Sequence, residues 1–283
     1  MDPYFYCREH NLAEQENYII LKQMKRLIVL ALILGSSLSL PGQTIHLTWA
    51  TNPAYPPYDW SLHGKHYHGA AEELIARLRL PGVEFVPVYV PWKRAQEMAK
   101  DGELDLLVNI RDTPEREIWL DFAQTPAFSN PIVIFMRRED QLKPGWQWDE
   151  LIPLHGGQAA GDSFGSPFDE FLKQHLTMQT APTVVQNFKK LLWRRIDFYV
   201  TSLYLGKLWL AKSGNSRYVG VLLPPVSEQA ITIAFSKRSR NVKLLAELDA
   251  RLAELRQKGV LDQIFAQAMT EAQQTDFSSL TRP

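Results

Sequence analysis

The sequence predicts an α/β protein with a largely parallel sheet. Three apolar segments typical of buried strands, at 45–50, 83–90 and 104–108, alternate with two helical patterns, at 69–80 and 92–100. A strand that returns to the same sheet after a helix needs a crossover, and such crossovers join parallel strands with right-handed geometry. We therefore expect helices packed on the faces of a twisted sheet.

The first strand and helix have clear boundaries. The strand ends in a loop rich in proline, 52–58, and the helical pattern at 69–80 stops before a Pro-Gly pair. Leu74, Ile75 and Leu78 share one face of that helix at the spacing of an amphipathic segment. This face is expected to lie on the sheet.

The second and third strands carry local signals of their own. Pro87 lies inside the strand at 83–90, where it removes a donor of the hydrogen-bond ladder, so this strand should lie at a sheet edge or carry a bulge. After the strand at 104–108, Thr113 is a good N-cap and Pro114 fits the first position of a helix. A short helix is therefore predicted to begin there.

Polar side chains gather where this strand ends and the short helix begins. Asn109, Arg111 and Arg116 lie at the junction, and open α/β sheets bind ligands beyond the carboxyl ends of their strands. A guanidinium held there can grip a carboxylate through two parallel hydrogen bonds. The alternative from the spacing alone is that Arg116 pairs with a surface acid, such as Glu115 or Glu117.

A second α/β series is predicted with weaker signals after an apolar strand at 131–138. An amphipathic helical region at 241–268, with a break at Gly259, closes the series. The remaining elements are expected as helical turns at 148–154, 166–176 and 187–195 and as strands at 158–160, 183–185, 196–200 and 229–236.

Composition is that of a soluble globular protein. The 283 residues are enough for two domains of ordinary size, and apolar and charged residues make up 45% and 22% of the chain. Lys+Arg and Asp+Glu are balanced at 31 each, so no bulk charge points to nucleic acid. The single cysteine, Cys7, excludes an internal disulfide and any multi-cysteine metal site.

The N-terminus carries an export signal. Lys25 and Arg26 precede a short apolar run, 27–34, which is followed by small residues, and the simplest cleavage point is after Ser39. The run is shorter than the roughly 20 residues that span a bilayer. We expect residues 24–39 to be a signal peptide, residues 1–23 to be an over-extended reading frame, and the mature protein to be periplasmic.

The order and spacing of several short segments give the sequence a resemblance to a known family. From about 43 to 272 the chain resembles the extracellular solute-binding proteins of family 3, the amino-acid-type substrate-binding proteins of ABC transporters. No single motif is specific, but the order and spacing of the set are. The matching segments are 55–58, Gly69 with Glu73, 102–105, 113–116, 121–122, 195–197, 233–237 and 258–259.

The resemblance implies a fold and a division of the chain. The family fold is the two-lobed type II periplasmic binding protein fold, in which two crossover hinge strands join two α/β lobes and the ligand is enclosed between them. The implied bounds are 43–131 plus 229–272 for lobe one, 132–228 for lobe two and 273–283 for a C-terminal tail.

The resemblance also implies a ligand site. Arg116 falls on the family's carboxylate-binding arginine, and Tyr55 and Trp92 fall on its two aromatic positions. Asn109 and Arg111 occupy positions usually held by small hydroxyl residues, and Ser163 falls on a hydroxyl position of lobe two. Two positions where the family commonly has an aspartate are held by Ser202 and Asn52. The aromatic pair has an alternative as packed lobe-surface residues, and Arg94 as a residue that covers its helix.

These departures predict a particular class of ligand. Two guanidinium groups without a facing acid would bury uncompensated positive charge, which is costly. An anionic solute, such as a dicarboxylate or an acid without an α-ammonium, would supply the balance. The alternative is that Arg111 turns outward to Asp112 or Glu115 and that Ser202 accepts an amine through water.

The expected function is non-catalytic binding of an amino acid or related organic acid by hinge closure. A monomer would deliver the solute to an ABC permease or a membrane sensor, without a cofactor, a metal or nucleic acid. One alternative is an enzyme on the same scaffold, such as a cyclohexadienyl dehydratase with Glu72 or Glu73 as general acid. Another is an interaction module that binds no small ligand.

Two motifs suggest chemistry that the sequence does not support. Gly161-Asp162-Ser163-Phe164-Gly165 matches a nucleophile elbow, but the strand before it is poor and His175 is the only later histidine. His63, His66 and His68 have zinc-ligand chemistry, but they lie in a polar loop where a hairpin tip is the simpler interpretation.

Overall fold

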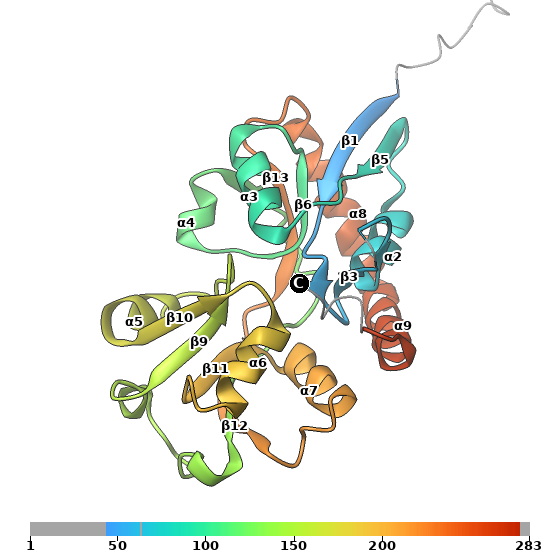
Figure 1. Ribbon diagram of the computed structural model, residues 1–283. Helices are drawn as coiled ribbons and strands as arrows, with labels where there is room; N and C mark the ends of the chain where they lie inside the picture. Colours follow the sequence, from blue (N-terminus) through green and yellow to red (C-terminus); the bar gives the residue numbers. More distant parts are fainter. Residues whose placement is uncertain (1–43, 63, 278–283) are drawn as a thin grey trace, which may run out of the picture. The chain divides into compact units, whose positions relative to one another are not determined.

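The computed structural model describes residues 44–62 and 64–277, whose strands form two five-stranded sheets and one three-stranded sheet (Figure 1). The predicted signal peptide and the predicted extension before it lie outside the described residues. No helix in the described part of the chain is long and apolar enough to cross a membrane.

The first large sheet has the strand order β5-β1-β6-β13-β7. β1 pairs parallel with β5 and β6, whereas β13 arrives from the C-terminal part of the chain and pairs antiparallel with β6 and β7. β5 lies at the edge, as Pro87 predicted. The strands are β1 (Ile45–Ala50), β5 (Val83–Pro87), β6 (Leu106–Arg111), β7 (Leu120–Phe122) and β13 (Ile231–Ser236).

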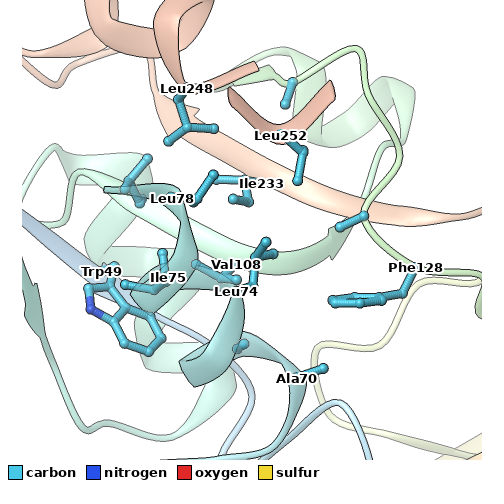
Figure 2. Packing of buried hydrophobic residues seen from close by; sticks show 14 of the residues in the cluster. Trp49, Ala70, Leu74, Ile75, Leu78, Val108, Phe128, Ile233, Leu248 and Leu252 are labelled. Carbon is cyan, nitrogen blue, oxygen red and sulfur yellow. The ribbon is translucent and has the colours of Figure 1, made fainter. Parts of the chain in front are cut away.

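Helices cover both faces of this sheet. Residues of α2 (Ala70–Leu78), α8 (Leu245–Gln257) and α9 (Val260–Gln274) join β1, β6 and β13 in one buried cluster. Figure 2 shows Leu78 near Leu248 and Leu74 beside Val108. α3 (Trp92–Asp101) packs on the opposite face. The predicted break between the last two helices is confirmed, because Gly259 has φ +68° there.

The start of α2 depends on a glycine. Gly69 has φ +92°, and a Cβ atom there would lie 2.6 Å from the ring of Trp60 and 2.8 Å from the carbonyl oxygens of Pro57 and Tyr58. Only a residue without a side chain allows this approach. The contact positions the small sheet β2 (Ala54–Tyr55), β3 (Asp59–Ser61) and β4 (Tyr67–His68) against the helix.

The second large sheet has the order β10-β9-β11-β8-β12. Alternate residues of its buried strand β8 face opposite sides. Ile132, Ile134 and Met136 lie in the cluster with α5, and Val133 and Phe135 lie in the cluster with α6 and α7. The elements are β8 (Ile132–Arg137), β9 (His155–Ala159), α5 (Phe168–His175), β10 (Thr177–Ala181), α6 (Val184–Leu192), β11 (Phe198–Ser202), α7 (Leu203–Lys212) and β12 (Val219–Ser227), with 3₁₀ turns at Arg138–Asp140, Trp148–Leu151 and Val242–Leu244.

Two connecting segments join the sheets. One is 123–131, between β7 and β8, and the other is 228–230, between β12 and β13. The first is bridged to the start of β13 through an antiparallel pairing of Phe128 with Ile231. The chain thus consists of two α/β lobes joined twice, while the exact lobe boundaries stay a prediction.

Some sequence predictions are wrong. The expected strand at 183–185 is the start of α6, because the side chain of Thr183 caps that helix by accepting a hydrogen bond from the backbone N–H of Gln186. Its β-branched residues imitate a strand, whereas the strand itself is β10, just before it. Neither α7 nor β12 was predicted, and β6 continues beyond the expected end at 108 as far as Arg111.

Candidate functional site

Two neighbouring cavities lie at the loops that follow β1, β6 and β9. The larger has a volume of about 510 Å³ and the smaller about 40 Å³, and Asn52, Tyr55, Trp92 and Asp162 line both. Each cavity is lined by residues of both lobes. Six of the seven predicted ligand-binding residues line the small cavity: Tyr55, Trp92, Asn109, Arg111, Arg116 and Ser163.

Arg116 is positioned by the short helix α4 (Pro114–Glu117), whose N-cap is Thr113 as predicted. Its side chain is buried, at 6% exposure. Nη1 donates to the carbonyl of Arg111 (3.0 Å), while Nη2 donates to the side chain of Gln96 (3.3 Å) and to the carbonyl of Gly161 (3.2 Å).

The charge of Arg116 has no paired acid. Within the described residues it forms no ion pair, so the alternative of a surface salt bridge with Glu115 or Glu117 is wrong. Burial lowers the pKa of the Arg116 guanidinium to about 10, so it stays a cation at neutral pH. A buried, unpaired cation is a strong attractor for an anion.

Arg111 reaches both connecting segments. It projects from the end of β6 and donates to the carbonyl of Asn130 (2.8 Å), to the carbonyl of Gln229 and to the Ser227 hydroxyl (3.3 Å). The side chain is 3% exposed. The alternative that it turns outward to Asp112 or Glu115 is therefore wrong. Its hydrogen bonds instead join β6 to the two connecting segments.

Asn109 occupies an unusual backbone conformation. Its φ is +57°, which asparagine tolerates better than most residues, and β6 and β13 change register nearby. Its amide Nδ2 donates to Oδ1 of Asp59 at 2.8 Å. Burial raises the pKa of the Asp59 carboxyl well above its usual value. Asn109 thus holds a buried acid of the small sheet while it lines the cavity.

The two predicted aromatic residues come together at the cavities. Tyr55 stacks on Tyr58 with ring centroids 5.8 Å apart, and its hydroxyl accepts a bond from the side chain of Asn130 at 3.4 Å. Burial raises the pKa of the Tyr55 phenol. Trp92, the first residue of α3, is half-buried. Neither ring is only part of a lobe core, since both line the two cavities.

The two predicted serines differ. The Ser163 hydroxyl lines the small cavity and donates to the Asp169 carboxylate, not to a histidine as in a hydrolase. Ser202 is fully buried and lines neither cavity. Its hydroxyl lies near the phenols of Tyr55 and Tyr58, where it opposes the rise in their pKa.

The family model described as bacterial extracellular solute-binding proteins, family 3, matches residues 47–271. The chain belongs to this family. A comparison with curated protein sequences found no match.

Solved structures share the fold of this solute-binding protein. The amino acid ABC transporter substrate-binding protein AbpA from Streptococcus pneumoniae, bound to L-arginine, has a TM-score of 0.66 at 19% identity and covers 80% of this chain and 95% of its own. ArtJ from Geobacillus stearothermophilus, an arginine-, lysine- and histidine-binding protein, has a TM-score of 0.65 at 20% identity, covering 78% and 94%. A histidine kinase sensor domain has a TM-score of 0.67 at 19% identity and covers 80% of this chain and 96% of its own. The predicted two-lobed fold class is confirmed.

Sequence reasoning missed Asp162. This half-buried side chain lines both cavities, and burial raises its pKa to about 7 although Arg116 and Arg111 oppose the rise. The available signal in the sequence was the acid beside Ser163 in the stretch 161–165. The premise that no acid faces the two guanidinium groups is wrong, and the argument for a net-negative ligand falls with it.

The remaining candidates lie away from the cavities. Glu73 pairs with Arg77 at 2.6 Å on α2, and Glu72 is exposed, so neither proposed general acid lines a cavity. Arg94 covers its helix and pairs with Glu103 at 3.1 Å. His63 lies outside the described residues, and the described part of the chain holds no group of three metal-ligating side chains.

Proposed function

We propose that this solute-binding protein encloses a small carboxylate-bearing solute, an amino acid or a related organic acid, between its lobes. Arg116 binds the carboxylate, and Tyr55 and Trp92 contact the rest of the solute. The observation that carries the proposal is the buried guanidinium of Arg116, which lines the small cavity and has no ion-pair partner among the residues described.

The hydrogen bonds of Arg116 support this role. The guanidinium has five N–H donors, and its three bonds to Arg111, Gln96 and Gly161 use only Nη1 and Nη2. At least two donors are therefore available to a carboxylate. A carboxylate would also balance a charge whose isolated burial is unfavourable.

The larger cavity supports a solute with a side group. Its volume of about 510 Å³ falls in the range of small-molecule sites. Tyr55 and Trp92 line both cavities, so their rings lie beside the point where a carboxylate head would meet the remainder of the solute. Aromatic faces bind apolar groups and cations alike.

The two connecting segments support binding by hinge closure, because a few residues at the ends of elements can absorb the rotation of one lobe against the other. The family places such proteins outside the cytoplasm, and we propose a periplasmic monomer without catalytic activity. The structural likeness to ABC-transporter binding proteins and to a histidine kinase sensor domain favours delivery to a permease or a membrane sensor.

Ligand screening tests this function. Purified mature protein is mixed with amino acids and small carboxylates, and the unfolding temperature is followed because a bound solute stabilises the folded state. Hits are measured by calorimetry in Arg116→Met, with Arg94→Met as the matched control from an exposed arginine. We expect binding to fall at least tenfold only in Arg116→Met, as for loss of a charged hydrogen bond. Equal binding by both variants contradicts the proposal.

A further inference from the structure

A third cavity lies next to the candidate site. It has a volume of about 460 Å³, and its walls come from the start of α6, from α7 and from the chain at the end of α9. Four residues line both this cavity and the larger cavity of the site. The small charged cavity, the larger aromatic cavity and the third cavity therefore form a series of neighbouring spaces. The four shared residues are Ala54, Thr183, Val184 and Leu205.

The walls of the third cavity are rich in apolar side chains, and packing behind the walls holds them in place. Trp209 stacks on Phe188 with ring centroids 4.4 Å apart. Leu208 shares a buried cluster with Trp60, and Phe277 meets the Trp60 ring edge-on at 5.7 Å. The cavity is therefore built by both lobes and is largely preformed. Its main apolar lining is Pro56, Val185, Leu205, Leu208, Trp209 and Phe277.

Several polar groups in these walls already bond within the protein. The ammonium of Lys212 donates to the carbonyl of Gln273 at 2.9 Å and lies over the Phe277 ring, 5.4 Å from its centroid. The hydroxyls of Ser213 and Thr275 each donate to a backbone carbonyl of the preceding helical turn. A second charged group of the solute would find these donors occupied. The third cavity thus fits an apolar group.

We infer that the solute carries a long apolar chain, which extends from the larger cavity of the site into the third cavity. This inference rests on the proposed function. Either of the two larger cavities alone falls in the range of small-molecule sites, so a solute whose side group fills the first leaves the third without an occupant. Apolar walls left open to water are unfavourable, and an apolar chain that continues from the bound head would cover them.

Two homologous series test the inference, the unbranched carboxylic acids and the unbranched α-amino acids, each lengthened by one methylene at a time. Calorimetry gives the dissociation constant and the heat capacity change of binding. Beyond the length that the larger cavity holds, each added methylene should still tighten binding about fourfold, as for a fully buried CH₂ group. It should also make the heat capacity change more negative. The two series separate chain length from the presence of an ammonium.

The variant Ser213→Trp reduces the space in the third cavity. Ser213 is exposed at the end of α7 and lines this cavity but neither of the other two. We expect the variant to bind short members of each series as wild-type protein does and to bind the longest members roughly tenfold more weakly. The matched control is Ser216→Trp, since Ser216 is also exposed and lines none of the three cavities. It should keep the wild-type series.

Two results overturn the inference. One is that affinity for wild-type protein stops rising within the short members, which needs no variant to fold and leaves the third cavity to another occupant, such as a second protein. The other is that Ser213→Trp keeps the full gain of the long members. Arg116→Met should weaken every member by the same factor, because it removes only the carboxylate contact. Unchanged binding by Arg116→Met contradicts the proposed function, so the two failures are distinguishable.

Discussion

Nη2 of Arg116 lies 3.2 Å from the carbonyl oxygen of Gly161, so an arginine of the first lobe bonds to the backbone of the second. Nε2 of Gln96 donates to the same oxygen at 3.2 Å. Three of the five N–H donors of Arg116 bond to protein groups, so a carboxylate would use the remaining donors of the same guanidinium. The contact between the lobes and the binding of a solute are therefore coupled through one guanidinium.

The first prediction tests this coupling with Gly161→Ala. Gly161 has φ +84°, and a Cβ atom there would lie 2.9 Å from Nε2 of Gln96. We expect a loss of about 1–2 kcal/mol in the free energy of unfolding from backbone strain, together with weaker solute binding in calorimetry. The control is Gly214→Ala, with φ +69° and no atom within 4 Å. It should lose similar stability but bind normally, and identical binding by the two variants contradicts the coupling.

The second prediction concerns Arg111→Met. Removing this side chain leaves the carbonyls of Asn130 and Gln229 without a charged donor at the two connecting segments. We expect the free energy of unfolding, measured in urea, to fall by about 2–4 kcal/mol because buried acceptors lose their partners. Arg138→Met is the control, since exposed Arg138 also donates to a backbone carbonyl, that of Ser216, which lies outside both connecting segments. A loss no greater than in this control shows that Arg111 does not stabilise the crossovers.

The third prediction is a pH dependence of binding. Burial raises the pKa of Asp162 to about 7 in the folded protein, so the folded state holds a proton that the unfolded state has released. The proton that Asp162 retains therefore adds to the free energy of unfolding at low pH, and this addition is lost as the pH rises towards 7. A solute that places a cationic group beside Asp162 would favour the ionised carboxylate, so the affinity for such a solute would change with pH in the opposite direction.

Calorimetry of unfolding and of binding between pH 5 and pH 8 checks both signs, the one for stability and the one for affinity. Amino-acid affinity should rise by up to roughly tenfold per pH unit below the pKa of Asp162 and level off above it. The other charged groups that act on this carboxylate are Arg116, Arg111 and Asp169. Asp162→Asn should flatten the profile, and an unchanged profile in that variant assigns the titration to another group.

The fourth prediction uses intrinsic fluorescence. Trp92 lines both cavities, so solute binding should change its solvent contact and its emission. The chain has eight tryptophans, and the test is therefore the variant Trp92→Phe, which should lose most of the solute-induced change. Trp193→Phe serves as the control because Trp193 is 62% exposed and lines neither of the two cavities of the site. A full response in Trp92→Phe removes that residue from the site.

The sequence by itself determined the features that depend on neighbours along the chain. Pro87 predicted an edge strand because proline lacks the N–H donor that an inner strand needs for pairing on both sides. Thr113 with Pro114 predicted the start of α4. Apolar periodicity located β1, α2 and α3, because it too depends only on residues close together in the chain. Where local signals conflicted, as at Thr183 with its two following valines, the capping bond and the packing of α6 outweighed strand propensity.

The candidate site was predicted in part. Six of the seven expected residues line the small cavity, because the order and spacing of their motifs follow the family and loops after parallel strands converge at one edge. The hydrogen-bond partners of each side chain were not predictable. Arg111 was expected at a ligand but bonds to Asn130 and Gln229, whose positions depend on how both crossovers fold.

Only the tertiary structure decided the charge balance of the cavity. Arg116 and Asp162 belong to different lobes, and nothing in the segments around either residue specifies the other as a neighbour. Their proximity arises because the loop after β9 meets the start of α4, where the carbonyl of Gly161 bonds to the guanidinium. Local propensity acts over a few residues, whereas the field of a half-buried charge depends on which distant groups the fold brings near it.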